Sequence, residues 1–164
     1  MNIMPYNRVV KDLNLLSVAE FMARVATRFE ISPASSVLEP GRRHQFSMYL
    51  GGKWYELLPK EGSFAESDAV ARLDVSILQD NLLSPVLGIR NPRTDQRIHF
   101  VGGIRGTGEL ERLVDGGEYV VAFALFPTSI HELIDLADAG KIMPPKSTWF
   151  EPKLRSGLFV HLLS

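Results

Sequence analysis

The apolar residues of the chain recur with two spacings, one typical of helices and one typical of strands. In residues 17–29 they follow the helical period, and Ser17 and Glu20 form the signature of a capping box. Residues 119–126 are apolar without interruption and rich in β-branched and aromatic side chains, which predicts a strand covered on both faces. The whole chain gives predicted strands at 2–10, 46–50, 53–58, 97–101, 119–126 and 158–163, and predicted helices at 17–29, at 74–83, around Leu110 to Val114 and between Ser129 and Gly140.

Glycine and proline separate these segments. Gly51 and Gly52 stand between two strand-like runs and predict a tight hairpin, because the primed turns that join such strands need positive φ. Residues 32–43 and 59–68 are rich in turn-forming residues, and we expect both to be loops.

Two of the predicted helices have cap signals. Asp74 is expected to cap the helix at 74–83, and Ser129 with Glu132 forms a second capping box. The helix after Ser129 has an apolar stripe that we expect to be buried. Its members are Ile130, Leu133, Ile134 and Ala137.

The order of these elements predicts an α+β fold. We expect residues 1–164 to form one domain, with a mixed sheet of about six strands and about four helices. The strand at 119–126, the helix after Ser129 and the strand at 158–163 are expected to form a C-terminal right-handed βαβ unit.

Composition excludes several classes of protein. The 164 residues carry a formal net charge of −1, which argues against nucleic acid or a membrane surface held by bulk charge. The absence of cysteine excludes disulfides and zinc–thiolate sites and fits a cytoplasmic location. No apolar run approaches the about 20 residues that span a bilayer, and the N-terminus lacks the pattern of a signal peptide.

The stretch at 143–153 is unusual for a connector, because it combines three prolines with lysines, hydroxyls and aromatic rings. Lys146, Ser147 and Thr148 supply one cation and two hydroxyls behind two prolines that fix the backbone, a combination that phosphate sites use. The alternative is a rigid surface loop whose lysine is solvated. The sequence favours neither interpretation.

A glycine-rich turn follows the strand at 97–101. It has the strand–glycine–helix context of a phosphate loop, but it matches neither the dinucleotide fingerprint nor the Walker A motif. Arg105 could offer a bidentate fork to an anion, with Gly103 and Gly106 allowing a close approach. The alternative is a tight structural turn.

We expect the two candidate segments to meet. If their strands share a sheet, Arg105 and the residues 146–148 converge on one concave site for a phosphate or carboxylate. The four histidines are widely separated in the sequence and predict no metal site.

Five segments, at 6–13, 73–79, 100–106, 122–129 and 143–157, together resemble the C-terminal half of a prokaryotic family called domain of unknown function 1015. That family is similar to the ParB/sulfiredoxin-like group, which includes free-serine kinases. The resemblance implies small-molecule phosphoryl transfer, with a phosphate donor such as ATP, ADP or pyrophosphate and Mg²⁺. No catalytic residue can be carried over, because the family's Asp-Gly-His-His-Arg motif is not in this chain.

The resemblance also implies partners. We expect the chain to be the C-terminal portion of a longer protein, inactive alone, with the N-terminal half as its partner. An apolar surface left open could form a homodimer in a crystal, and a small anion is the expected ligand, whereas nucleic acid and membrane are not expected. The alternatives are a ParB-like module that binds nucleic acid or protein, and a structural half without its own site.

Overall fold

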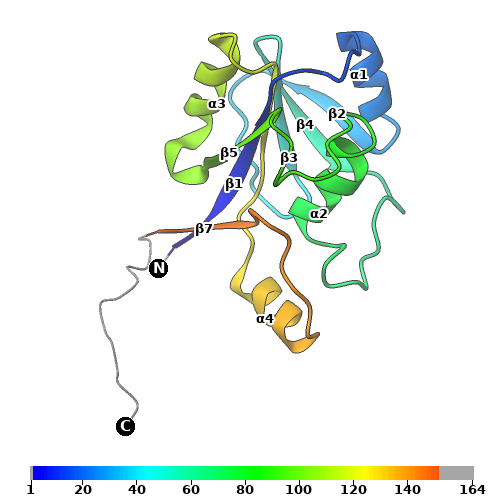
Figure 1. The fold of residues 1–164 in the computed structure, drawn as a ribbon, viewed down its shortest axis with the longest axis vertical. Coiled ribbons are helices and arrows are strands. Elements are labelled where there is room, and N and C mark those ends of the chain that lie inside the picture. The colour runs from blue at the N-terminus through cyan, green and yellow to red at the C-terminus, as the bar shows by residue number, and fades with distance from the viewer. Residues whose placement is uncertain (1, 152–164) are drawn as a thin grey trace.

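The strands form one twisted sheet, and helices pack against both of its faces (Figure 1). The computed structural model describes residues 2–151. Its strands are β1 (Asn2–Val10), β2 (Phe29–Ala34), β3 (Phe46–Leu50), β4 (Lys53–Pro59), β5 (Ile98–Gly102), β6 (Val121–Ala124) and β7 (Thr148–Glu151). Its α-helices are α1 (Val18–Val25), α2 (Asp74–Leu78), α3 (Gly106–Asp115) and α4 (Ile130–Asp138).

The sheet has the strand order β2-β4-β3-β6-β1-β5, and β7 pairs with the first half of β1. All pairings within residues 2–151 are antiparallel, so the expected α+β class is confirmed but the expected mixed sheet is wrong for this part of the chain. The strand expected at 158–163, which would have completed the βαβ unit, lies outside the described residues.

The expectation for the apolar run at 119–126 is confirmed at its centre. β6 lies between β3 and β1, and all four of its residues are buried. Because both neighbours pair with it and both faces are covered, no position in it tolerates a polar side chain.

Two apolar cores lie on the two faces of the sheet. One contains Val10 of β1 and packs against α1 and α2, and the other contains Val9 and packs against α3. Successive residues of a strand point to opposite faces. The alternation therefore continues back along β1, placing Arg8 on the α2 face and Asn7 on the α3 face.

The first helix is confirmed with its capping box, in which Ser17 Oγ accepts from Glu20 N and the Glu20 carboxylate accepts from Ser17 N. The helix ends at Val25, earlier than expected, and Phe29 begins β2 instead. Residues 32–34 were expected to be loop, but they belong to β2 and include Pro33. An edge strand tolerates a proline, since one side of its backbone has no ladder partner.

One hairpin and one helix form as their local sequence predicts, but the expected cap of that helix does not. Gly51 and Gly52 form the β3–β4 hairpin with φ of 59° and 77°. The expected helix at 74–83 is present, with a π-helical turn over Gln79–Leu83. Asp74 does not cap it: Leu73 is the N-cap residue, and the Asp74 carboxylate instead accepts from His44 N at 3.0 Å.

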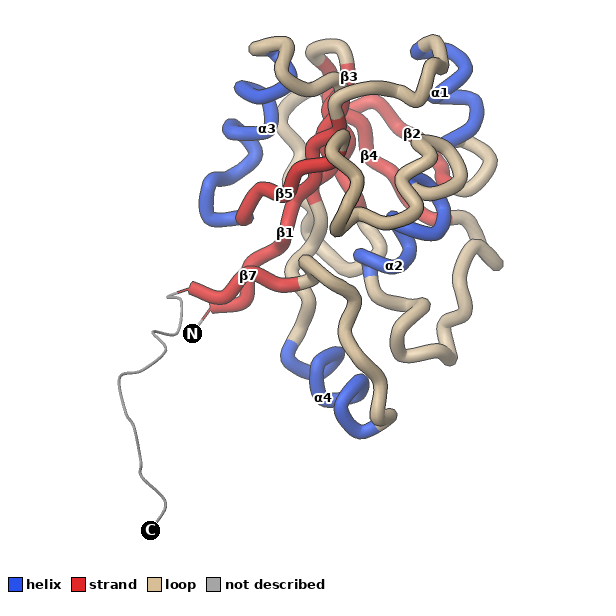
Figure 2. The backbone as a smooth tube through the Cα atoms, viewed as in Figure 1, coloured by secondary structure: helices blue, strands red, loops and turns tan. Residues whose placement is uncertain are grey.

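α4 has the expected capping box of Ser129 and Glu132, but its expected buried stripe is wrong. Ile130 and Ile134 are 51% and 48% exposed, and the residues that the helix buries are Glu132 and Leu136. Figure 2 shows why: α4 stands at one end of the sheet rather than across its face. Glu132 turns inward because it pairs with Arg43 at 2.9 Å, and this rotates the isoleucines outward.

Candidate functional site

Arg8 is the most unusual side chain of the sheet. It is the second residue of the buried part of β1, opposite Phe100 of β5, and is only 4% exposed. Its guanidinium donates to the carbonyl oxygens of Tyr6 and, at 3.0 Å, of Lys146, and it lies 5.2 Å from the centre of the Phe100 ring. The cation is therefore enclosed by backbone oxygens and an aromatic face.

No carboxylate within residues 2–151 forms an ion pair with Arg8. Burial lowers the pKa of Arg8 to about 9, so the group still carries its charge at neutral pH. Burying a charged group without a counter-ion costs roughly several kcal/mol unless an opposite charge or hydrogen bonds compensate for the lost water. Such a cation suggests that the negative partner comes from outside residues 2–151.

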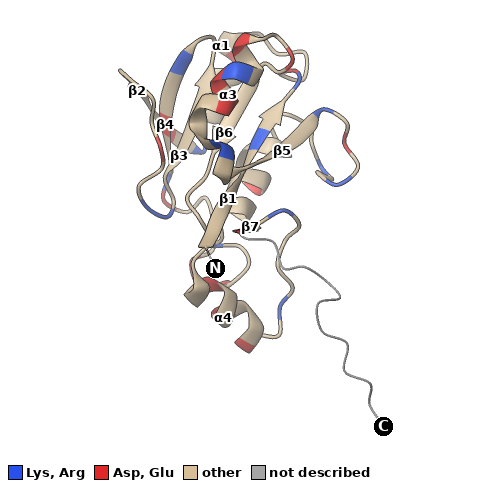
Figure 3. Ribbon diagram, turned by 90° about the vertical axis from the view of Figure 1, so that its left-hand side faces the viewer, with Lys and Arg blue, Asp and Glu red and all other residues tan. Residues whose placement is uncertain are grey.

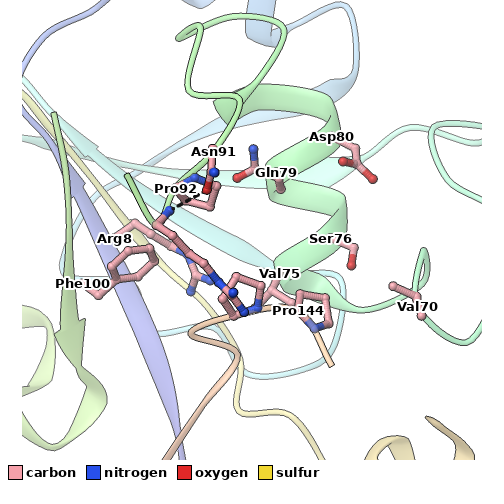
Figure 4. A pocket seen from close by; sticks show the side chains of 12 residues that line it. Arg8, Val70, Val75, Ser76, Gln79, Asp80, Asn91, Pro92, Phe100 and Pro144 are labelled. Carbon is pink, nitrogen blue, oxygen red and sulfur yellow. Dashed lines mark hydrogen bonds between the residues drawn. The ribbon is translucent and has the colours of Figure 1, made fainter. Parts of the chain in front are cut away.

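A cavity of about 490 Å³ opens beside Arg8. Figure 4 shows Arg8 and Phe100 projecting from the strands on one side and Val75, Ser76 and Gln79 from the helix opposite. Apolar side chains form most of the wall, with Arg93 and Asn91 from the turn after the helix. The apolar lining residues are Val70, Val75, Pro92, Phe100, Pro144 and Pro145.

Polar groups on the wall are free to bind a ligand. Ser76 is buried, and its Oγ has no hydrogen-bond partner among residues 2–151. Gln79 donates through Nε2 to Ile89 O at 2.7 Å, which leaves its Oε1 as an acceptor. Asp80 also lines the cavity, and burial raises the pKa of its carboxyl.

The segment at 146–148 borders this site. Lys146 has φ of 57°, and its Nζ lies 5.4 Å from the centre of the Tyr6 ring. Its carbonyl oxygen is one of the two that accept from the Arg8 guanidinium. Ser147 is buried and donates through Oγ to Pro144 O at 2.6 Å, and Thr148 begins β7 opposite Pro5. The Ser147 hydroxyl thus holds the loop, and the loop supplies a wall of the cavity through Pro144 and Pro145.

Arg105 lies elsewhere. Its side chain is exposed and pairs with Glu109 at 3.5 Å, and it lines a separate cavity of about 380 Å³ together with Trp149. Gly103 and Gly106 line a third cavity, of about 310 Å³. Neither of these cavities includes Lys146, so the shared anion site of Arg105 and Lys146 stays a prediction.

Arg8 was not among the predicted site residues, although it lies inside the strand predicted at 2–10. The strand continues for two residues beyond Arg8, through Val9 and Val10. A signal was present: a charged residue directly before two buried valines, within a run of strand-forming residues, sits inside the strand rather than at its end.

A second polar cluster joins α2 to α4. Asp74 is buried, and this burial raises the pKa of its carboxyl to about 7, with nearby Glu132 raising it further. His44 Nε2 lies 3.8 Å from Asp74 Oδ1, and Arg43 pairs with Glu132. The adjoining cavity, of about 530 Å³, has basic and acidic residues in balance, so it lacks the net positive charge of the Arg8 cavity. Its charged and histidine residues are Glu30, Arg42, Arg43, His44, Lys60, Glu61 and Glu66.

Within residues 2–151, no group of three His, Asp or Glu side chains is placed to hold a metal ion. In the same part of the chain, the helices are too short or too polar to cross a bilayer.

Residues 1–76 match a family model described as "Protein of unknown function (DUF1015)". The matched region contains Arg8 and Ser76, on both sides of the cavity. Comparison with curated protein sequences gives no significant match.

The fold is similar to solved structures of about twice the length. A free serine kinase in complex with AMP matches with a TM-score of 0.54 at 13% identity, covering 90% of this chain and 52% of that chain. A mutant free serine kinase in complex with ADP gives a TM-score of 0.52 at 15% identity, covering 90% and 53%. A conserved hypothetical protein from Pyrococcus furiosus gives 0.54 at 14%, covering 90% and 54%. At these identities the likeness establishes the fold alone, and the chain spans about half the length of the structures it matches.

Proposed function

We propose that the protein binds a nucleotide in the Arg8 cavity and is the ligand-binding half of a small-molecule phosphoryl-transfer protein. The observation that carries the proposal is the buried Arg8 guanidinium, which has no carboxylate partner within residues 2–151 and lines the cavity. A phosphate would supply the missing negative charge and accept hydrogen bonds from the planar guanidinium fork. Arg93 adds a second cation to the same lining.

The rest of the cavity suits the base and the sugar. Phe100, Pro144 and Pro145 offer flat apolar surfaces for a planar ring, and Ser76 and Gln79 offer hydrogen-bonding groups. The volume of about 490 Å³ falls within the range of small-molecule pockets. Supporting this choice of ligand, two of the proteins with a similar fold are free serine kinases in complex with AMP and with ADP.

The proposal includes a second domain that supplies the catalytic groups. Its support is the outward apolar face of α4 and the turn after it, where Ile130, Ile134 and Ile142 are about half to nearly fully exposed. The solved structures with a similar fold are about twice as long as this chain, which leaves length for a domain that covers this face. Exposed apolar surface of this kind commonly marks an interface.

Calorimetric titration of AMP and adenosine tests the nucleotide site. We expect Arg8→Met to weaken AMP binding by about ten- to a hundredfold, because a charge-assisted hydrogen bond contributes about 1.5–3 kcal/mol. Adenosine, which lacks the phosphate, should bind weakly and equally to both proteins. Arg105→Met is the matched control, since Arg105 is exposed and lines another cavity.

Two outcomes would overturn this assignment. AMP binding that survives Arg8→Met unchanged would show that Arg8 does not hold the phosphate. AMP binding that is lost in Arg105→Met would place the anion at the glycine-rich turn instead.

Nucleic-acid binding has less support. The net charge is −1, and Figure 3 shows Lys and Arg distributed among Asp and Glu rather than gathered on one face. Nonspecific affinity for nucleic acid depends on neutralising many phosphates, which needs a broad basic surface.

A further inference from the structure

Asn7 is the neighbour of Arg8 on β1 and faces the other side of the sheet. It is 3% exposed, and its Oδ1 accepts from Leu125 N at 3.1 Å. A backbone N–H can only donate, so this bond fixes which end of the amide is the oxygen. The Nδ2 group must then point elsewhere, and it donates to no other group among residues 2–151.

Asn7 Nδ2 is not among the fully buried atoms of residues 2–151 that lack a partner, so this donor of an almost wholly buried side chain is open to water or to a ligand. Asn7 lines the cavity of about 310 Å³ between β1, β6 and the start of α3. The Nδ2 group is therefore a donor available to whatever occupies that cavity.

The start of α3 adds further donors. Its N-cap residue is Arg105, and no side chain caps the helix. Gly106 N donates to Gly103 O, so the available donors are first-turn amides beyond Gly106. Gly103 and Gly106 keep this end bare: a Cβ on Gly103 would lie 2.6 Å from Pro5 Cδ, and Gly106 has φ of 70°. Both glycines line the cavity, so the backbone comes close to an occupant.

The opposite polar wall accepts hydrogen bonds. Glu39 lines the cavity, accepts from Thr107 Oγ1 at 3.5 Å, and makes no ion pair within residues 2–151. The remaining lining is mostly apolar. Its members are Met4, Pro5, Pro40, Ala124, Leu125, Phe126 and Pro127.

We propose that this cavity is a second small-molecule site, for a compound with an apolar body and a polar end in which an acceptor oxygen stands beside an N–H donor. The oxygen accepts from Asn7 Nδ2 and the N–H donates to Glu39. β1 separates this site from the Arg8 cavity, so the two do not share a ligand, and this proposal does not rest on the nucleotide site. Either a neutral amide or a zwitterion with adjacent ammonium and carboxylate groups has this chemistry.

Butanamide and pentan-2-one are the probes, since they have the same shape and differ in one group, the amide NH₂ against a methyl. In ¹H–¹⁵N NMR titrations we expect butanamide to shift the side-chain amide of Asn7 and the backbone amides of Thr107 and Leu125. Pentan-2-one, which cannot donate to Glu39, should bind more weakly. A second pair of probes, butyrate and 2-aminobutyrate, distinguishes the two ligand classes. Tighter binding of 2-aminobutyrate than of butyrate would identify the ligand as a zwitterion.

Asn7→Asp is the decisive variant. It keeps an acceptor for Leu125 N and replaces the free donor by an oxygen, so we expect butanamide binding to fall about tenfold. Glu39→Gln, at an exposed position, tests the site if the first variant does not fold. It should weaken butanamide but leave pentan-2-one unchanged. Absence of shifts at these amides up to the solubility limit, or equal affinities in parent and variants, would overturn the proposal.

Discussion

Replacing Arg8 by methionine should leave the stability of the free protein nearly unchanged while removing its affinity for phosphate. Methionine is unbranched, adapts to irregular space and carries no charge. The arginine it replaces is enclosed by Phe100 and two backbone carbonyls, with no carboxylate partner among residues 2–151. The substitution therefore removes a buried charge without leaving an opposite charge unpaired.

The structure sets the magnitude. Burial lowers the pKa of Arg8 from its ordinary value to about 9, and a change of this size corresponds to an upper limit of about 5 kcal/mol against the charged form. The methionine loses the hydrogen bonds to the carbonyls of Tyr6 and Lys146, each contributing about 1.5–3 kcal/mol when the donor is charged. These contributions nearly cancel, so we expect the free energy of unfolding to change by no more than about 1 kcal/mol, which shifts Tm by at most about 2–4 °C in a chain of this size.

Thermal and urea unfolding of the parent protein and Arg8→Met, each with and without AMP, measures both effects. AMP should stabilise the parent protein and not the variant, because a ligand stabilises only the state that binds it. Arg105→Met should change neither quantity, since this side chain is exposed. A loss of more than about 2 kcal/mol in Arg8→Met, together with unchanged stabilisation by AMP, would show that Arg8 is structural and refute the reasoning.

Three other substitutions test the fold around the sites. Asp74→Asn should remove a pH dependence of stability, because the Asp74 carboxyl has a pKa of about 7 in the folded protein and 3.8 ordinarily. Between pH 5 and pH 8, the free energy of unfolding of the parent protein should fall by about 2 kcal/mol more than that of the variant. Urea-unfolding profiles that stay parallel over this pH range would contradict this. Gly103→Ala should destabilise by about 1–3 kcal/mol through contact with Pro5, whereas Gly108→Ala, with nothing within 4 Å, should be neutral or stabilising in the same assay. Ile134→Glu should abolish any self-association seen by light scattering, and a strictly monomeric parent protein would argue against an interface on α4.

Local signals predicted local structure well. The capping boxes at Ser17 and Ser129 and the Gly51–Gly52 hairpin are formed within a few residues, so no distant contact decides them. The central position of β6 also followed, because an uninterrupted apolar run requires cover on both faces.

The errors arose where distant residues decide. The period of α4 showed that it has an apolar stripe, but the pairing of Glu132 with Arg43, far apart in the sequence, decides that the stripe faces outward. Asp74 was expected to cap a helix and instead accepts from His44 of a distant loop. The role of Arg8 depends on its neighbours in the folded protein, which are Phe100 of β5 and the cavity residues of α2. The spacing of residues along one strand does not show which residues these are.

The central claim, that the Arg8 cavity holds the phosphate of a nucleotide, is tested most directly by a crystal structure of the protein with AMP. We expect phosphate oxygens within about 3 Å of the Arg8 guanidinium, and the base against Phe100 and the prolines at 144 and 145. AMP bound in the cavity of Arg42, Arg43 and Lys60, or beside Arg105, with the Arg8 cavity filled only by water, would contradict the account.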